Sequence, residues 1–110
     1  LVTSHPDSKY AGEAKKVLDQ ARNRLARHEW YVANFYYKRK KWAGAARRLE
    51  TLVEKYPGSG HEVDALFKLA DAYLKMDEKH RAMKALQQVV VKHADDPRRP
   101  EAEKELASLR

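Results

Sequence analysis

The residues of this chain that could carry out chemistry do not combine into a catalytic or metal-binding motif. His28 and Glu29 begin the pattern of a zinc-binding helix, but Val32 stands where the second histidine would be needed. Asp95 and Asp96 precede a proline, which is typical of a turn and helix cap rather than an acid–base pair. The serines lack the glycine-flanked turn of a nucleophile, and the four glycines form no phosphate loop. We therefore expect no enzyme, no cofactor and no metal site.

Basic side chains are the main chemical feature, because many of them gather in one part of the sequence. The chain has 23 Lys and Arg against 16 Asp and Glu, which gives a formal net charge of +7. Such a patch suits an acidic protein partner, although a solvated helix surface explains it equally well. Nucleic acid is the weaker alternative, because the aromatic residues among these charges have the spacing of helix-packing residues. The basic patch comprises Arg22, Arg24, Arg27, Lys38, Arg39, Lys40, Lys41, Arg47 and Arg48.

Apolar residues recur at a distance of 37 residues, which indicates an internal repeat. In each unit a small alanine stands three residues before a tyrosine, as in the first helix of a tetratricopeptide hairpin. Such units stack helix pair on helix pair and present a surface to other proteins. The structural repeat positions are Ala33, Tyr36, Trp42, Ala45 and Leu49 in the first unit and Ala70, Tyr73, Ala82 and Leu86 in the second.

The repeat predicts an all-α fold, a tetratricopeptide-like helical repeat array that forms part of an α-solenoid. We expect residues 1–110 to be a single C-terminal tetratricopeptide-repeat domain of a longer protein, with repeat units at about 24–57 and 61–97. No proline or turn cluster interrupts residues 8–39, which predicts one long helix. Further helices are predicted over residues 42–55, up to about 77, over 78–93, and from 100 onward as a short capping helix.

Two local expectations concern the boundary of one helix and the face of another. Ser59 and Glu62 have the spacing of a capping box at the start of the third helix. An apolar stripe along the long helix, which includes Leu18, Leu25 and Phe35, carries His28 as well. We therefore expect His28 at a core or boundary position.

Three segments carry a closer resemblance to a known family. They are HPDSKYAGEA (residues 5–14), RNRLARHEWYVANFYYKRKKW (residues 22–42) and LVEKYPGSG (residues 52–60). Together they resemble the C-terminal half of the BamD family, the outer-membrane lipoproteins of the bacterial β-barrel assembly machinery, or BAM complex. The most specific part of the match comprises Arg24, Leu25, Ala26, Glu29, Val32, Ala33, Tyr36, Tyr37, Arg39 and Trp42.

The resemblance implies a periplasmic scaffold that helps to insert outer-membrane proteins. Its C-terminal repeats would dock on a POTRA domain of BamA, the barrel subunit, and contact accessory Bam lipoproteins. It implies no nucleic-acid partner, and membrane contact only through a lipid anchor that is absent from this sequence. The resemblance places at Arg48 an arginine that faces an acidic residue of BamA. Arg47, Arg39 and Lys41 are weaker candidates for partner binding, supported mainly by neighbouring charge.

Two features depart from the family pattern. Lys40 follows Arg39 where family members commonly have a helix-ending glycine, so we expect this turn to be capped differently. The tail after Ala94 is longer and more basic. The alternative reading is another periplasmic tetratricopeptide interaction module, such as the TolA-associated coordinator of cell division. That family shares the YPGSG-like closing turn but does not show the segment from residue 24 to residue 42.

Overall fold

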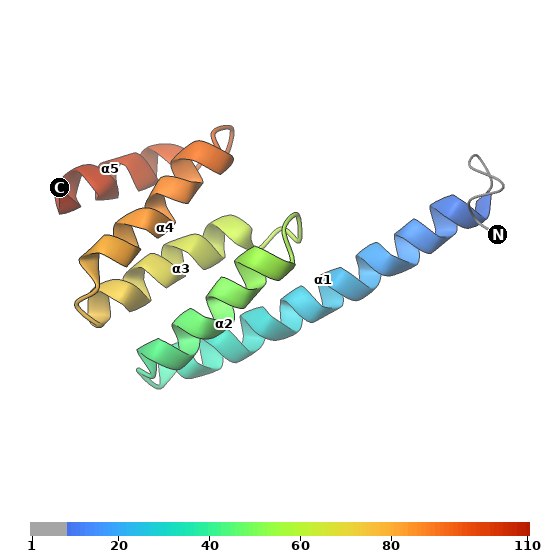
Figure 1. Cartoon of the computed structure of the whole chain (residues 1–110), viewed down its shortest axis with the longest axis horizontal. Coiled ribbons are helices and arrows are strands. Elements are labelled where there is room, and N and C mark those ends of the chain that lie inside the picture. Colours follow the sequence, from blue (N-terminus) through green and yellow to red (C-terminus); the bar gives the residue numbers. More distant parts are fainter. Residues whose placement is uncertain (1–8) are drawn as a thin grey trace.

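The computed structural model describes residues 9–110, and all regular secondary structure in that range is α-helical (Figure 1). The predicted all-α repeat array is therefore confirmed, together with its long first helix and short last helix. The helices are α1 (Lys9–Lys38), α2 (Trp42–Lys55), α3 (Glu62–Lys75), α4 (Lys79–Lys92) and α5 (Arg99–Leu109).

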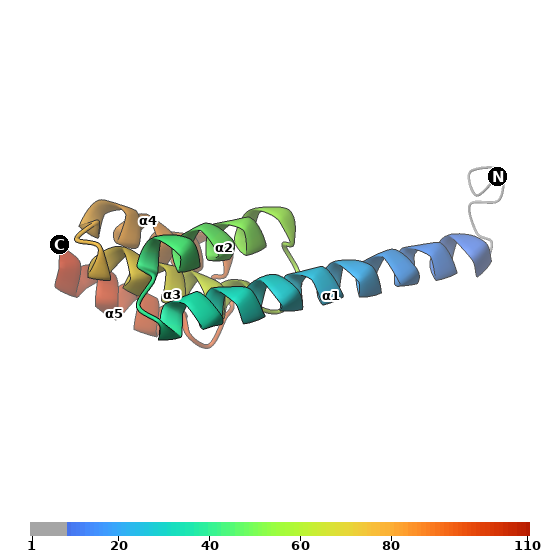
Figure 2. The ribbon, with the colours of Figure 1, turned by 90° about the horizontal axis from the view of Figure 1, so that it is seen from below.

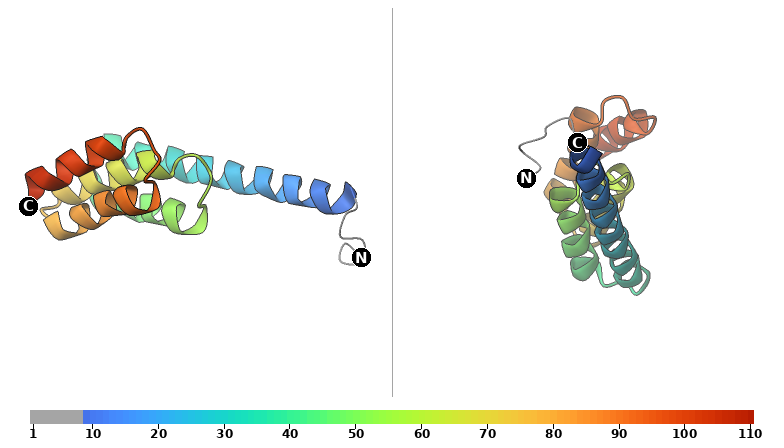
Figure 3. Two further views of the ribbon diagram at one scale, coloured as in Figure 1. Left: turned by 90° about the horizontal axis from the view of Figure 1, so that it is seen from above. Right: turned by 90° about the vertical axis from the view of Figure 1, so that its right-hand side faces the viewer.

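Each helix packs against the next one in the chain, so the molecule is a row of antiparallel helices rather than a closed bundle. The row measures 53 × 30 × 18 Å. Figures 2 and 3 show that the first half of α1 extends beyond the other helices. The second half of α1 forms the first hairpin with α2, and α3 forms the second hairpin with α4.

The core runs along the row and combines small residues with large aliphatic ones. Ala33, Ala45, Ala70 and Ala82 are buried, so they let neighbouring helix backbones approach closely. The largest fully buried side chains are Leu49, Leu52, Leu66, Leu86 and Val89, and α5 adds Ala102 and Leu106. Trp42 is partly buried against this core, and its ring meets the Tyr37 ring edge-on at 5.1 Å.

The turn within each hairpin has the same geometry. Lys40 and Asp77 stand 37 residues apart and both adopt the left-handed conformation, with φ of 60° and 61°. The Lys41 amide donates to the Tyr36 carbonyl at 2.9 Å, and the equivalent bond in the second hairpin measures 2.8 Å. This is the Schellman arrangement, which normally favours glycine. The expectation that Lys40 changes the cap of this turn is therefore wrong, because Lys40 itself adopts the positive φ that normally favours glycine.

The expected capping box at the start of α3 is wrong. His61 is the N-cap residue, and no side chain bonds to the first helical amides there. Ser59 Oγ instead accepts from the His61 amide at 3.4 Å, and Glu62 accepts from the Gly58 amide. Gly58 and Gly60 have φ of 82° and 91°, so the turn is longer than a capping box requires and Glu62 becomes the first helical residue.

The expectation for His28 is also wrong, because the apolar stripe that carries it faces solvent in the described part of the chain. Leu18, Leu25 and Phe35 are 63%, 51% and 44% exposed, and His28 is exposed as well. The buried face of α1 is marked by Ala26 and by the alanine seven residues later. Periodicity identified an apolar face correctly, but it did not reveal which face meets α2 and α3.

Candidate protein-interaction surface

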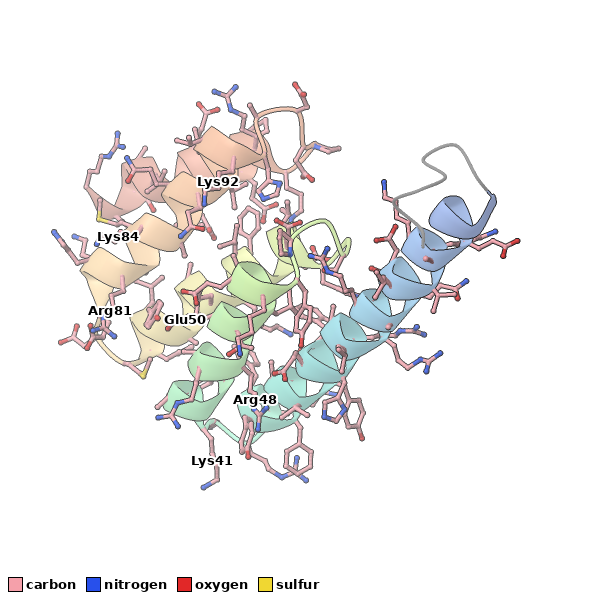
Figure 4. All side chains as sticks on the ribbon, turned by 45° about the vertical axis from the view of Figure 1, so that its right-hand side comes forward. Lys41, Arg48, Glu50, Arg81, Lys84 and Lys92 are labelled. Carbon is pink, nitrogen blue, oxygen red and sulfur yellow. The ribbon has the colours of Figure 1, made fainter. Side chains whose placement is uncertain are left out.

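Two of the four basic residues singled out from the sequence share a groove. Arg47 and Arg48, on α2, line a hollow of about 250 Å³ together with Gly44, Thr51 and Tyr36 of α1. We call these five residues the Tyr36 groove. Figure 4 shows Arg48 beside the contact between α2 and α1, and Lys41 at the beginning of α2.

Gly44 keeps the Tyr36 ring accessible from the groove. A Cβ atom at residue 44 would lie 3.4 Å from the ring of Tyr36, within tight van der Waals contact. A larger side chain on that turn of α2 would therefore cover the ring. With glycine there, the aromatic floor of the groove stays open beside the two arginines.

An internal ion pair orients Arg48. Its Nη1 atom lies 3.4 Å from both carboxylate oxygens of Glu29, on α1. The Glu29 side chain is only 13% exposed, whereas that of Arg48 is 43% exposed. A guanidinium group has five N–H donors, and this pair involves the nitrogen on one side of it. Arg48 can therefore hold Glu29 and still present donors to a second carboxylate in the groove.

Arg39 and Lys41 lie in the turn between α1 and α2, apart from the two groove arginines. The Arg39 guanidinium carbon lies 3.6 Å from the centre of the Phe35 ring, and Nη1 donates to the Phe35 carbonyl at 3.3 Å. Lys41 is exposed and forms the N-cap of α2 without a side-chain cap bond. Arg39 is thus held against its own helix. Lys41 adds positive charge at the beginning of α2, near the Tyr36 groove.

Sequence reasoning missed a polar network between α1 and α3. The Tyr37 hydroxyl donates to Asp71, and Lys68 Nζ donates to Asn34 while lying 4.7 Å from the Tyr37 ring centre. Burial, then the hydrogen bond to Asp71 and its negative charge, raises the pKa of Tyr37 to about 12. Both hydrogen bonds join residues 34 positions apart, so the spacing between polar residues on successive first helices is the signal that could have found them.

A second and larger groove lies between α2 and α4. It has a volume of about 440 Å³, and we call it the Tyr73 groove. The Tyr73 hydroxyl donates to Glu50 within it, and burial followed by this hydrogen bond raises the pKa of Tyr73 to about 12. The charged and polar walls of the Tyr73 groove comprise Glu50 and Glu54 of α2 and Arg81, Lys84 and Gln88 of α4.

The described residues contain neither a metal-binding cluster nor a membrane span. No group of three or more His, Cys, Asp or Glu side chains within residues 9–110 is arranged to hold a metal ion. None of the five helices combines the length and apolar character needed to cross a membrane.

Comparison with known proteins places the chain among outer-membrane lipoproteins. The family model for the outer membrane lipoprotein YfiO matches residues 1–89. Outer membrane protein assembly factor BamD of Xylella fastidiosa (strain 9a5c) is 37% identical over 97 residues, which cover 88% of this chain and 33% of that protein.

Two other relatives carry the same name. BamD of Haemophilus influenzae is 37% identical over 76 residues, covering 69% of this chain and 29% of that protein. BamD of Rickettsia prowazekii is 31% identical over 74 residues, covering 67% and 30%. The chain thus spans about a third of the length of the curated relatives it matches. The chain belongs to the outer membrane lipoprotein family that contains BamD.

Proposed function

We propose that this chain is part of a non-catalytic scaffold in the BAM complex, which assembles outer-membrane β-barrel proteins. Family membership supports this proposal, because the relatives are named outer membrane protein assembly factors. The repeat fold supports it as well, since stacked helical hairpins commonly serve as binding surfaces. In this proposal a lipid anchor elsewhere in the full-length protein holds the scaffold at the periplasmic face of the outer membrane.

The proposed partner of the Tyr36 groove is a POTRA domain of BamA, with accessory Bam lipoproteins bound elsewhere on the scaffold. The observation that carries this proposal is the orientation of Arg48, whose Nη1 is paired with Glu29 beside an open groove. An arginine fixed in this way loses little further side-chain entropy when it binds an acidic residue of the partner. Arg47 shares the groove, and Arg39 and Lys41 contribute positive charge in the adjacent turn.

Titration calorimetry of the chain against the cognate POTRA domain tests this proposal. We expect Arg48→Ala to weaken binding about tenfold or more, because the partner's carboxylate would lose its charge-assisted hydrogen bonds. Arg48→Glu should weaken binding further through like-charge repulsion, and reversing the acidic partner residue should restore part of the loss. Lys104→Ala, an exposed change on α5, is the matched control and should leave the affinity unchanged. Equal affinities for the wild type and both Arg48 variants would exclude Arg48 as a contact.

A further inference from the structure

The two grooves are copies of one another under the internal repeat. Adding 37 to the number of each residue that lines the Tyr36 groove gives a residue that lines the Tyr73 groove. In this way residue 36 gives Tyr73, 44 gives Arg81, 47 gives Lys84, 48 gives Ala85 and 51 gives Gln88. Each hairpin therefore forms an equivalent wall and floor from these five repeat positions.

The Tyr73 groove also has a second wall, which α2 supplies. Glu50 accepts a hydrogen bond from the Tyr73 hydroxyl, and Val53 and Glu54 continue this wall along α2. Figure 4 shows Glu50 on α2 and Lys84 on the neighbouring α4. The second hairpin thus demonstrates what a helix must offer to fit this wall: a carboxylate, an apolar residue three positions later, and a second carboxylate at the fourth position.

The Tyr36 groove has no such second wall within residues 9–110, since all its lining residues come from α1 and α2. It is also easier to enter. In the Tyr73 groove the Arg81 guanidinium lies 5.8 Å from the Tyr73 ring centre, but the residue equivalent to Arg81 is Gly44, which has no side chain. The Tyr36 ring is consequently more accessible to an incoming helix.

A helix of the length of α2, packed antiparallel on the described start of α1, would not reach the Tyr36 groove. α1 begins 27 residues before Tyr36, which is about 40 Å along the helix axis, whereas α3 begins 11 residues before Tyr73, about 16 Å. A preceding helix of the same length as α2, with 14 residues, spans about 21 Å. Packed antiparallel on the start of α1, it would end well short of the Tyr36 groove. The groove is therefore available to a helix of a partner protein.

We propose that the Tyr36 groove takes an acidic helix of a partner protein, whose two carboxylates, four residues apart, reproduce the positions of Glu50 and Glu54. The first carboxylate accepts from the Tyr36 hydroxyl, as Glu50 accepts from Tyr73. The second lies toward Arg47, which replaces Lys84 of the other groove and offers a planar, two-pronged donor set. This inference rests on the proposed function in one respect, since it takes the partner to be a component of the assembly complex. It adds the chemistry of the helix by which that partner makes contact.

A defined peptide tests the proposal directly. The probe is a fluorescein-labelled, alanine-based helix of about 20 residues that carries the pattern Glu-Thr-Leu-Val-Glu of residues 50–54. Its control carries glutamine in place of both glutamates. We expect fluorescence anisotropy with the full chain to show about tenfold tighter binding of the glutamate peptide. Tyr36→Phe and Arg47→Gln should each reduce this preference about threefold or more.

Matched variants separate the groove from general charge attraction. Tyr73→Phe should not change peptide binding, because Glu50 already engages the Tyr73 hydroxyl, and Lys104→Gln controls for the loss of one positive charge. Arg47 is exposed, so Arg47→Gln tests the groove even if Tyr36→Phe affects folding. Equal affinity for the two peptides, or equal losses for the Tyr36 and Tyr73 variants, would overturn the proposal.

The POTRA titration distinguishes failure of this inference from failure of the proposed function. If Arg48→Glu abolishes POTRA binding while the two peptides bind equally, only the acidic-helix inference is wrong. If the glutamate peptide binds with the expected preference but the POTRA domain does not bind, the proposed partner is wrong and the groove chemistry stands.

Discussion

At the scale of single residues, the repeat shows where this chain exchanges an apolar position for a charged one. Glu29 and Arg48 stand at the repeat positions of Leu66 and Ala85, which both belong to the buried core. The first hairpin thus has an ion pair, with Glu29 mostly buried, where the second hairpin has hydrophobic residues. An ion pair in which one partner stays exposed to solvent contributes little net stability. The exchange supports the proposal that Arg48 serves binding.

The second polar feature at this scale is the pair of partly buried tyrosine hydroxyls of Tyr37 and Tyr73, which predicts a pH dependence. The pKa of Tyr37 is raised to about 12 by burial and by Asp71, above the unfolded value of about 10. Because the folded state favours the neutral hydroxyl, its contribution to stability is complete below about pH 10 and is lost as the pH rises through 12. Absorbance at the tyrosinate band should therefore show a late titration step, which Tyr37→Phe reduces.

The same absorbance titration of the Asp71→Asn variant tests the contribution of the carboxylate to the pKa of Tyr37. Burial is the larger cause of the raised pKa of Tyr37, and the carboxylate adds to it. The substitution should therefore move the Tyr37 midpoint only part of the way from about 12 toward 10. An unchanged late step in Tyr37→Phe would show that Tyr37 does not titrate there.

Leu49 offers the clearest stability prediction. Its side chain is fully buried between the helices of the first hairpin and the next unit. Leu49→Ala should cost about 2 to 5 kcal/mol, the usual range for large-to-small changes in a core. A urea titration followed by circular dichroism measures the loss. Val91→Ala is the control, because Val91 is 70% exposed and should change stability by less than about 0.5 kcal/mol. A loss below about 1 kcal/mol for Leu49→Ala would contradict its place in the core.

At the scale of elements, the two hairpin turns have the same backbone conformation although their residue types differ. Lys40 and Asp77 adopt the same left-handed conformation, although neither is glycine. A residue with a Cβ atom pays a steric penalty in this region, and lysine lacks the short side chain by which aspartate and asparagine reduce it. The bonds that close the turn must therefore outweigh local preference.

Lys40→Gly should stabilise the chain by about 0.5 to 1 kcal/mol, because glycine adopts positive φ without that penalty. The gain is limited because glycine also increases the conformational freedom of the unfolded chain. Lys41→Gly is the matched control: Lys41 has φ of −91°, so glycine relieves no strain there and should not stabilise. Thermal unfolding of both variants measures the difference. Equal destabilisation by the two substitutions would show that Lys40 is not strained.

The sequence predicted the helices well and their contacts less well, for physical reasons. Periodicity and breakers placed α2 at its observed bounds and the end of α1 to within one residue. The predicted start of the long helix, residue 8, lies outside the described residues. The Tyr37–Asp71 bond was missed, because its spacing of 34 residues becomes informative only once α1 and α3 are known to lie side by side. The misplacement of His28 has the same cause. The candidate site was found as a cluster of charge, but the sharing of one groove by Arg47 and Arg48 needed the structure.

At the scale of the whole molecule, the long first helix has an exposed apolar face. The stripe of Leu18, Leu25 and Phe35 is exposed in the described chain. The residue of α3 at the repeat position of Phe35 is Ala72, 37 residues later, and Ala72 is buried. No helix of the described residues covers this face. The repeat units at about 24–57 and 61–97 remain a prediction.

Hydrogen exchange provides the last prediction. Residues 12–20 of α1 are all exposed, and the helix there extends beyond its neighbours (Figure 2). An unsupported stretch of helix is marginally stable in water, whereas the middle of α3 is buried between α2 and α4. Amides of residues 12–20 should therefore exchange about a hundredfold or more faster than those of residues 65–73. Measurement at two protein concentrations controls for self-association through the apolar stripe, which would protect α1 only at the higher concentration. Equal protection of both segments at low concentration would show that the chain stabilises the start of α1 by itself.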